Sequence, residues 1–332
     1  MAKRLGKTFL FFLLIMLSLI AIFGVLGYYA YVVVSRITGG ENFSAEEIFV
    51  APSFTRVEYS KKTDGLAKKT ISSIYIALFG VDKRYVDENG RSDSNLLVKV
   101  DFVGRKIKVI SILRDLLVEI PGYGQNKFNA AFSFGEVKLA LGTLNKTFNL
   151  GVTKYAVVNF SIAEQLIDAV GGVTIEVKPE ELEQLNLCIK ELARLSKDGY
   201  VPLLTTPGTH LLNGRQAVAY SRIRKVGNGD ITRVQRQQKV LAEVFKKAKS
   251  MPISTRLKLI DMVSRNLKTN LSIEELKVLA FEDYSTYTME TFRIPASGTF
   301  REAIIEIAGT PSFVFIADLE KNKEMLHEFL EN

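Results

Sequence analysis

The sequence predicts an α/β or α+β sandwich, in which helices flank a central mixed sheet and one transmembrane helix precedes the domain. Three observations predict it: a long uncharged run near the N-terminus, short segments rich in β-branched and aliphatic residues, and longer segments with apolar residues at helical spacing. Strands that alternate with helices favour helices packed on a sheet. The composition, 47% hydrophobic and 24% charged over 332 residues, is typical of a globular protein with one core.

The N-terminal segment predicts a membrane anchor. Residues 9–34 carry no charge and exceed the roughly 20 apolar residues that a helix needs to cross a bilayer. Lys3, Arg4 and Lys7 precede this run, so the positive-inside tendency places residues 1–8 in the cytoplasm and everything after the run outside. A cleaved signal peptide or a buried core helix is the alternative. The length of the run favours the anchor, and we expect a single-pass cell-membrane protein with an extracytoplasmic domain.

The rest of the chain divides into a stalk and one domain. Residues 35–69 are rich in glycine, serine and charge and lack a sustained apolar period, which predicts an extracytoplasmic stalk. Residues 70–332 are predicted to form one domain. Its last part, 251–332, continues the mixture of strands and helices without a recognisable linker and is therefore assigned to the same domain.

The expected elements of this domain follow from local patterns. Segments 74–79, 95–100 and 106–112 are predicted strands, and a turn at Gly104 joins the last two into a hairpin. The next predicted elements are helices at 131–148 and 162–170 and a strand at 173–177, with Gly171-Gly172 ending the second helix. Asp230 is the predicted N-cap of a later helix with one apolar face.

The counts of cysteine, histidine and charge restrict the chemistry. Cys188 is the only cysteine, which excludes an intramolecular disulfide and a cysteine-based zinc cluster. His210 and His327 are the only histidines, so carboxylates would have to supply most ligands of any metal. The net charge of +8 favours an anionic partner. We expect no nucleic acid partner, because the predicted membrane span puts these charges outside the cell.

Arginines in apolar-rich segments are candidates for a binding site, because an unpaired charge there would be costly to desolvate. Arg222 and Arg224 are two residues apart, so on an extended chain both guanidinium groups project from one face and would clamp a pyrophosphate. Arg114, at the end of a predicted strand, and Arg233 with Arg236, near a helix start, would complete the cage. Alternatively, each arginine pairs with a structural carboxylate or lies in solvent.

Two aspartates are candidate metal ligands. Asp82 follows the strand 74–79 through Gly80, and Asp93 precedes the strand that begins near Asn95, so adjacent strands would bring the carboxylates together. Two such oxygens with substrate phosphates suit Mg2+, which usually keeps water and binds through one or two carboxylates. An Asx-turn at Asp82 and a cap or turn role for Asp93 are the alternatives, and the spacing leaves both open.

Eight short motifs follow one another over about half the chain. In the first half these are Gly80-Val81-Asp82-Lys83-Arg84, Arg91-Ser92-Asp93-Ser94, Ser111-Ile112-Leu113-Arg114-Asp115 and Lys127-Phe128-Asn129-Ala130-Ala131. In the second half these are Val170-Gly171-Gly172-Val173, Leu212-Asn213-Gly214-Arg215-Gln216-Ala217, Tyr220-Ser221-Arg222-Ile223-Arg224, and Gly229-Asp230 with Arg233 and Arg236-Gln237-Gln238. In this order they resemble the LytR-CpsA-Psr family, whose members usually carry a membrane helix before the domain.

The resemblance implies a fold, an activity and partners. Family members have a sheet flanked by helices, an apolar tunnel for a polyprenyl tail and arginines at its mouth, and they transfer a glycan phosphate from polyprenyl pyrophosphate to a peptidoglycan hydroxyl. The implied roles here are catalysis by Asp82, Arg91, Asp93 and Arg114, pyrophosphate binding by Arg114, Arg222, Arg224, Arg233 and Arg236, and Mg2+ coordination by Asp82 and Asp93. Phosphoryl transfer depends chiefly on such positioning and charge neutralisation.

Two positions depart from the family pattern. Leu113 stands where proline usually precedes the motif arginine, and Leu116 stands where threonine usually follows the aspartate. The first change removes a φ constraint without removing charge, and the second removes a hydroxyl. A non-catalytic lipid or glycan receptor and a pyrophosphatase acting on the same lipid are the alternative functions. Lys127 and Asn129 are secondary candidates for phosphate contact, and the helix 131–148 either lines a tunnel or packs in the core.

Overall fold

The computed structural model describes residues 40–51, 59–60, 70–81, 90–252, 255–256 and 268–332. The predicted transmembrane segment 9–34, much of the predicted stalk, and Asp82 lie outside the described residues. Residues 40–51 of the predicted stalk instead pack on the domain, because Ile48 is 0% exposed in the apolar core of the domain and the Ile48 carbonyl accepts from Asn145 Nδ2. Among the helices that the structure describes, none is both long and apolar enough to cross a bilayer.

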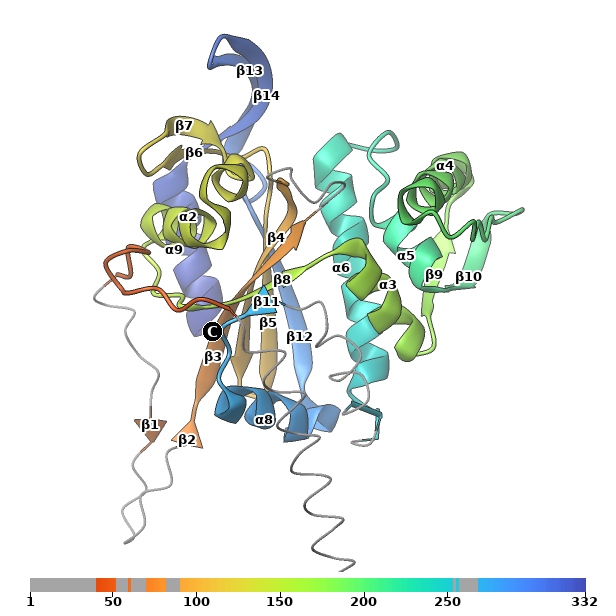
Figure 1. Cartoon of the computed structure of the whole chain (residues 1–332), viewed down its shortest axis with the longest axis horizontal. Helices are drawn as coiled ribbons and strands as arrows, with labels where there is room; N and C mark the ends of the chain where they lie inside the picture. The colour runs from red at the N-terminus through yellow and green to blue at the C-terminus, as the bar shows by residue number, and fades with distance from the viewer. Residues whose placement is uncertain (1–39, 52–58, 61–69, 82–89, 253–254, 257–267) are drawn as a thin grey trace, which may run out of the picture.

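A mixed sheet of six strands lies at the centre of the domain (Figure 1). Its order is β11-β8-β3-β4-β5-β12, with β3 antiparallel to β4 and parallel to β8, and β12 parallel to β5. The strands are β3 (Ser73–Val81), β4 (Ser92–Asp101), β5 (Lys106–Ile112), β8 (Lys154–Val158), β11 (Lys268–Thr269) and β12 (Thr288–Ile294). The sheet confirms the predicted fold class, and β3, β4 and β5 contain the three predicted strands.

One side of the sheet is covered by α2 (Ala130–Phe148) and α9 (Leu319–Glu331) (Figure 1). The larger apolar core lies here, and it includes Leu97 and Ile110 from the sheet and Leu141 from α2, all fully buried. The predicted helix 131–148 is confirmed as α2, with a break at Gly135 and Glu136, whose backbone angles are non-helical. Its buried residues belong to this core, as the core-packing alternative expected.

The other side of the sheet faces a second group of helices (Figure 1). These elements are α3 (Phe160–Ala169), β9 (Val173–Val177), α4 (Pro179–Ser196), β10 (Gly208–Leu212), α5 (Gly214–Tyr220) and α6 (Gly229–Ala248). They enclose a separate apolar core that includes Leu185 and Tyr220. Gly171 and Gly172 have φ of 78° and 74° and end α3 as predicted, because glycine adopts positive φ at little cost.

The predicted N-cap of α6 is wrong. The helix begins at Gly229 with Asn228 as the cap, and Asp230 lies inside the first turn. Its carboxylate pairs with Arg233 three residues later, at 2.8 Å. The carboxylate is drawn to the guanidinium on the same helix face and is not available to cap the backbone.

The remaining described elements surround these layers. They are β1 (Tyr59–Ser60), β2 (Thr70–Ile71), β6 (Leu117–Ile120), β7 (Gly124–Lys127), α8 (Ile273–Phe281), the 3-10 turn η2 (Tyr284–Thr286), β13 (Phe300–Ile307) and β14 (Thr310–Ala317). β6–β7 and β13–β14 are antiparallel hairpins at one end of the domain, joined by a bridge between Leu116 and Phe315 (Figure 1). The sequence analysis did not predict these hairpins. Strands β6 and β7 have only four residues each and β7 is polar, whereas the eight-residue strands β13 and β14 lie in 251–332, where no individual elements were assigned.

The two departures from the family motif are both buried in the core. Leu113 and Leu116 are each 0% exposed. The N–H of Leu113 donates to Ile294 O at 2.8 Å, a hydrogen bond that proline could not make. At this position a backbone bond to the end of β12 therefore takes over the restraint that proline would supply.

Candidate functional site

One edge of the sheet brings together the ends of strands that are distant in sequence. β3 and β4 are antiparallel, with Val81 opposite Ser92 across a bulge, so β4 begins where β3 ends. β5 also ends at this edge, because it is antiparallel to β4. Asp93 at the start of β4 and Arg114 just after β5 meet here, with Arg114 Nη1 2.6 Å from Asp93 Oδ1.

A cavity of about 600 Å³ opens at this edge and runs between the sheet and the helices α3, α4 and α6. Most of its wall is apolar, and representative residues are Leu78, Leu96, Phe160, Ala163, Leu166 and Val244. Its charged residues include Asp93, Arg114, Arg222, Arg224 and Arg233. The cavity therefore lies between the two apolar cores and combines a cationic mouth with an apolar interior.

Arg114 is the centre of the charged cluster. Besides Asp93, its guanidinium lies 3.2 Å from Asp115 and 3.4 Å from Asp230. Burial disfavours the charged form of Arg114, but the three carboxylates outweigh this effect and raise its pKa. Arg114 therefore carries a fixed positive charge. It is held in place by Asp93 at the start of β4, Asp115 just after β5 and Asp230 in α6.

Arg224 and Arg233 contact the same two residues, Asp93 and Asp230, but at different distances. Arg233 is 2% exposed, pairs with Asp230 at 2.8 Å and donates to Asp93 O at 3.1 Å. Arg224 is further away, at 3.6 Å from Asp93 and 3.8 Å from Asp230. Burial lowers the pKa of Arg233 to about 10 and also lowers that of Arg224, and both remain charged at neutral pH. Arg224 is the less well compensated cation.

Arg222 lines the cavity from a turn, and the expected extended strand is wrong here. The N–H of Arg222 donates to Ala219 O at 3.0 Å, so the chain turns at the end of α5 before it reaches α6. The guanidinium lies 4.7 Å from the ring centroid of Phe160 and 3.2 Å from Glu191. Arg222 and Arg224 both line the cavity, and a turn places them there.

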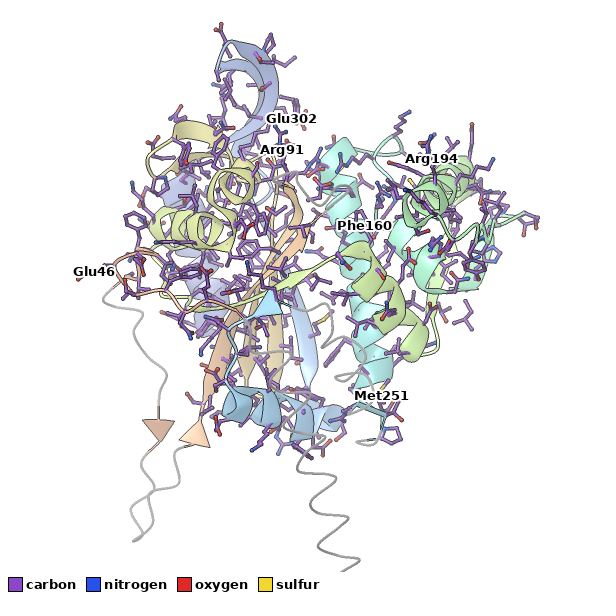
Figure 2. All side chains as sticks on the ribbon, in the orientation of Figure 1. Glu46, Arg91, Phe160, Arg194, Met251 and Glu302 are labelled. Atoms are coloured by element: carbon purple, nitrogen blue, oxygen red, sulfur yellow. The ribbon has the colours of Figure 1, made fainter. Side chains whose placement is uncertain are left out.

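Two expected site residues do not line the cavity. Arg236 is 3% exposed, pairs with Glu181 of α4 at 2.8 Å and donates to the carbonyls of Ile223 and Val226 at 3.0 Å. It therefore fixes the turn that carries Arg224. Arg91 is exposed beside the start of β4 and has no ion pair within the described part of the chain (Figure 2).

Asp93 is the one predicted metal ligand that the structure describes. Burial disfavours its charged form, but Arg114, Arg224 and Arg233 outweigh this and lower its pKa. Within the described residues its Oδ2 has a long contact, 3.6 Å, to Arg224, which leaves this oxygen less tightly paired than Oδ1. This donor suits Mg2+, which takes one or two carboxylates with water and phosphate oxygens. Among the described residues no group of three or more His, Cys, Asp or Glu could hold a metal.

Asp115 and Asp230 belong to the site but were not predicted as site residues. Lys127 Nζ lies 2.9 Å from Asp115, which links the secondary candidate Lys127 to the cluster. Asn129 is 1% exposed, and its N–H donates to Arg114 O at 3.1 Å. The adjacency of Arg114 and Asp115, and the three-residue spacing of Asp230 and Arg233, were the signals available in the sequence.

The fold and the cavity define a class of α/β sandwich whose apolar cavity, between sheet and helices, ends in a cluster of arginines. The family model of the LytR_cpsA_psr family matches residues 50–325. The chain belongs to this family, which confirms the resemblance of its motifs.

Individual relatives agree with this assignment. The chain is 33% identical over 241 residues to the polyisoprenyl-teichoic acid–peptidoglycan teichoic acid transferase TagU of Enterococcus faecalis, covering 71% of this chain and 73% of the relative. It is 27% identical over 299 residues to the regulatory protein MsrR of Staphylococcus aureus, covering 86% and 85%. A solved structure of YwtF (TagT) with bound octaprenyl pyrophosphate lipid is similar with a TM-score of 0.57 and 27% identity, covering 84% of this chain and 99% of that one.

Proposed function

We propose that this chain is a transferase that takes a phosphoglycan from a polyprenyl-pyrophosphate carrier and attaches it to a peptidoglycan hydroxyl. The observation that carries the proposal is that Arg114, Arg224 and Arg233 meet around Asp93 and Asp230 in the wall of an apolar cavity, which Arg222 also lines. An amphiphile with an anionic head and a long apolar tail matches this wall. The transferase name of TagU and the octaprenyl pyrophosphate bound to TagT, both similar proteins, support the same ligand class.

The arginines have donors to offer such a head group. Nη1 of Arg222 and Nε of Arg233 are buried and have no hydrogen-bond partner in the part of the chain that the structure describes. Arg224 contacts its carboxylates only beyond hydrogen-bond distance. Phosphate oxygens can therefore be bound at the mouth, after small side-chain movements, without breaking internal hydrogen bonds of these groups.

The proposed reaction makes use of this placement. A hydroxyl oxygen of the acceptor attacks the phosphorus nearest the glycan, the bond from that phosphorus to the bridging oxygen breaks, and polyprenyl phosphate leaves, while the hydroxyl proton is released to solvent. Arg114 and Arg224 neutralise the charge that develops on the phosphate oxygens, and the rigid contacts of Arg114 keep it in position.

Magnesium and the membrane complete the proposal. Asp93, together with Asp82, would hold Mg2+, and the ion when bound supplies further charge neutralisation at the phosphates. Arg91 would support the same site. The uncharged segment 9–34 would anchor the chain in the cell membrane and place the cavity on the outside, where the peptidoglycan acceptor is found.

The test starts with the ligand. The full chain is purified in detergent and its organic extract is analysed by mass spectrometry, with a polyprenyl phosphate or pyrophosphate as the expected result. An empty cavity that also refuses added octaprenyl pyrophosphate would refute the proposal.

The reaction type is tested with a lipid-linked glycan that carries 32P at the phosphorus nearest the sugar. A transferase moves the label into wall polymer, and this is the expected outcome. Label in free phosphoglycan would identify a pyrophosphatase instead, and tight binding with no release of label would identify a receptor.

A further inference from the structure

Two aromatic rings form an exposed stacked pair outside the cavity. Tyr123, at the tip of the β6–β7 hairpin, and Phe134, in α2, have ring centroids 4.7 Å apart and an interplanar angle of 15°. They are 56% and 40% exposed, respectively, so part of the apolar surface of both rings stays in water. Two adjacent exposed rings of this kind offer an apolar surface on which a ligand can pack.

The backbone on both sides of the pair is held in uncommon conformations. Gly122 and Gly124 flank Tyr123 with φ of 79° and 73°. Gly135 and Glu136, directly after Phe134, are non-helical inside α2, and Glu136 has φ of 48°. A side chain at Gly135 would place a Cβ 2.7 Å from Leu139, so glycine is required there. Positive φ at a non-glycine residue is costly and is concentrated at functional sites.

Strand β7 connects the aromatic pair to the arginine cluster. It runs from Gly124 to Lys127, and Lys127 Nζ lies 2.9 Å from Asp115, which contacts Arg114. At roughly 3.3 Å per residue, Tyr123 lies about 13 Å along the chain from Lys127. Gln125 is exposed and two residues from Lys127, so both side chains project from the same face of the strand. The contacts of Lys127 and Asp115 thus connect β7 to Arg114, and the aromatic pair lies at the far end of this short strand.

We propose that the Tyr123–Phe134 pair is a saccharide subsite, which binds a pyranose ring of the lipid-linked glycan beyond the pyrophosphate. The C–H face of a sugar ring packs on exposed aromatic surface, while its hydroxyls bond polar groups such as the Gln125 amide. The inference rests on the proposed function and extends it, because it assigns the glycan a path along β7.

The glycan of the lipid-linked donor is a better candidate for this subsite than the glycan strand of the peptidoglycan acceptor. A single aromatic platform contributes little affinity, which is too weak to capture a dilute glycan strand. A sugar attached to a pyrophosphate in the arginine cluster is held within reach, and its effective concentration is in the millimolar range. Weak stacking then suffices to orient the glycan, so the donor is the expected occupant.

The experiment compares two ligands by calorimetry of the full chain in detergent. One, the bare lipid, is the methyl ester of octaprenyl pyrophosphate, which has the same number of ionisable oxygens as a glycosylated lipid, and the other is octaprenyl pyrophosphate carrying chitobiose. Wild-type protein is expected to bind the chitobiose lipid roughly fivefold more tightly than the bare lipid. Tyr123→Ala/Phe134→Ala should lose this advantage and keep the affinity for bare lipid. Tyr123→Phe should retain it, and Leu211→Ala, which removes an exposed side chain on β10, should behave as wild type.

The remaining outcomes separate the inference from the proposed function. Failure of wild-type protein to bind bare lipid overturns both. Equal affinity of wild type for the two lipids, or an advantage that survives in the double variant, overturns the subsite alone. Loss of free chitotetraose binding in the double variant, with the lipid advantage intact, would assign the pair to the acceptor and overturn the donor assignment. If the alanine double variant is unstable, Tyr123→Leu/Phe134→Leu, which preserves more side-chain bulk, replaces it, and its results are interpreted in the same way.

Discussion

At the mouth of the cavity the charges are shared among several partners. Arg114 contacts three carboxylates, and Asp93 and Asp230 each face three guanidinium groups. Removing the most weakly paired residue of such a network should therefore cost less folding free energy than removing Arg114, which makes the most contacts. Arg224 is that weakly paired residue, because both of its contacts exceed 3.5 Å.

Arg224→Ala is therefore expected to weaken binding of octaprenyl pyrophosphate by roughly tenfold or more, with little effect on folding. The affinity of Arg224→Lys should lie between those of wild type and Arg224→Ala, since lysine offers a point charge in place of a planar fork. Titration of each full-length variant with the lipid checks this. Arg194→Ala removes the same charge from an exposed position on α4 and should bind as wild type (Figure 2). Equal losses in the Arg224 and Arg194 variants would indicate a net-charge effect.

Asp93→Asn should separate binding from turnover. Removing a negative charge beside Arg114 and Arg224 should leave metal-free affinity for the pyrophosphate unchanged or higher, because the anionic head meets less repulsion. Transfer in the presence of Mg2+ should fall roughly 100-fold, since a proposed metal ligand is lost. Binding and transfer are measured on the same preparation, with Glu306→Gln as an exposed control. Unaltered transfer would exclude Asp93 from metal binding.

The lowered pKa of Asp93 also gives a prediction for stability. A carboxyl whose pKa is lower in the folded than in the unfolded state stabilises the fold above the ordinary aspartate pKa of about 3.9, and this contribution is lost as the pH falls through the lowered value. The free energy of unfolding of Asp93→Asn should accordingly fall less steeply than that of wild type below about pH 4. Denaturant titrations across the acid range measure this slope.

At the scale of elements, β5 is joined to β12 by the bond from Leu113 N to Ile294 O at 2.8 Å. Leu113→Pro restores the family residue but removes this bond and a buried side chain, so we expect the free energy of unfolding to fall by about 2 to 5 kcal/mol. Leu113→Ala keeps the N–H, and the difference between the two variants reports on the bond. Equal stability of the two would mean that the bond contributes nothing.

The contact between α6 and α4 depends on a buried ion pair. Arg236 and Glu181 have side chains 3% and 5% exposed, so Arg236→Met leaves an uncompensated buried carboxylate and should lower the free energy of unfolding by roughly 3 to 5 kcal/mol. Arg236→Met/Glu181→Gln should recover part of the loss. Chemical denaturation measures both. A lipid affinity that falls in the single variant while stability is unchanged would return Arg236 to the binding site.

At the scale of the whole molecule, the cavity is the space left between two separate apolar cores, one on each side of the sheet. The volume of the cavity limits how much of the polyprenyl tail can be buried. Affinity for prenyl pyrophosphates should rise with chain length and then level off when about 600 Å³ is filled, since each buried CH2 contributes about 0.8 kcal/mol.

Val244→Trp should reduce the tail length at which affinity levels off. Val244 lies on α6 in the cavity wall, about 16 Å along the helix from Arg233, so a bulky ring there occupies space needed by the tail and leaves Arg233 untouched. We expect geranyl pyrophosphate to bind as in wild type and octaprenyl pyrophosphate to bind more weakly. Competition titrations over a series of chain lengths measure both. A uniform loss for all chain lengths would show that the substitution disturbs the fold instead.

The sequence by itself determined the layers and the family. Periodicity and β-branching predicted β3, β4, β5, α2, α3 and β9, because these signals act between neighbours in the chain. It also named Asp93, Arg114, Arg222, Arg224 and Arg233, all of which line the cavity. The family motifs supplied this information, because these five residues stand in motifs that follow one another in the family's order.

Only the tertiary structure decided which partner each charge has. Arg233 and Arg236 are three residues apart on one helix and read alike in sequence, but Arg236 meets Glu181, 55 residues away, while Arg233 faces the start of β4. Likewise, Asp230 pairs locally with Arg233, and only the packing of α6 against the sheet brings Arg114 next to it. A salt bridge between distant segments depends on how helices pack on a sheet, and that packing is not encoded in any local pattern.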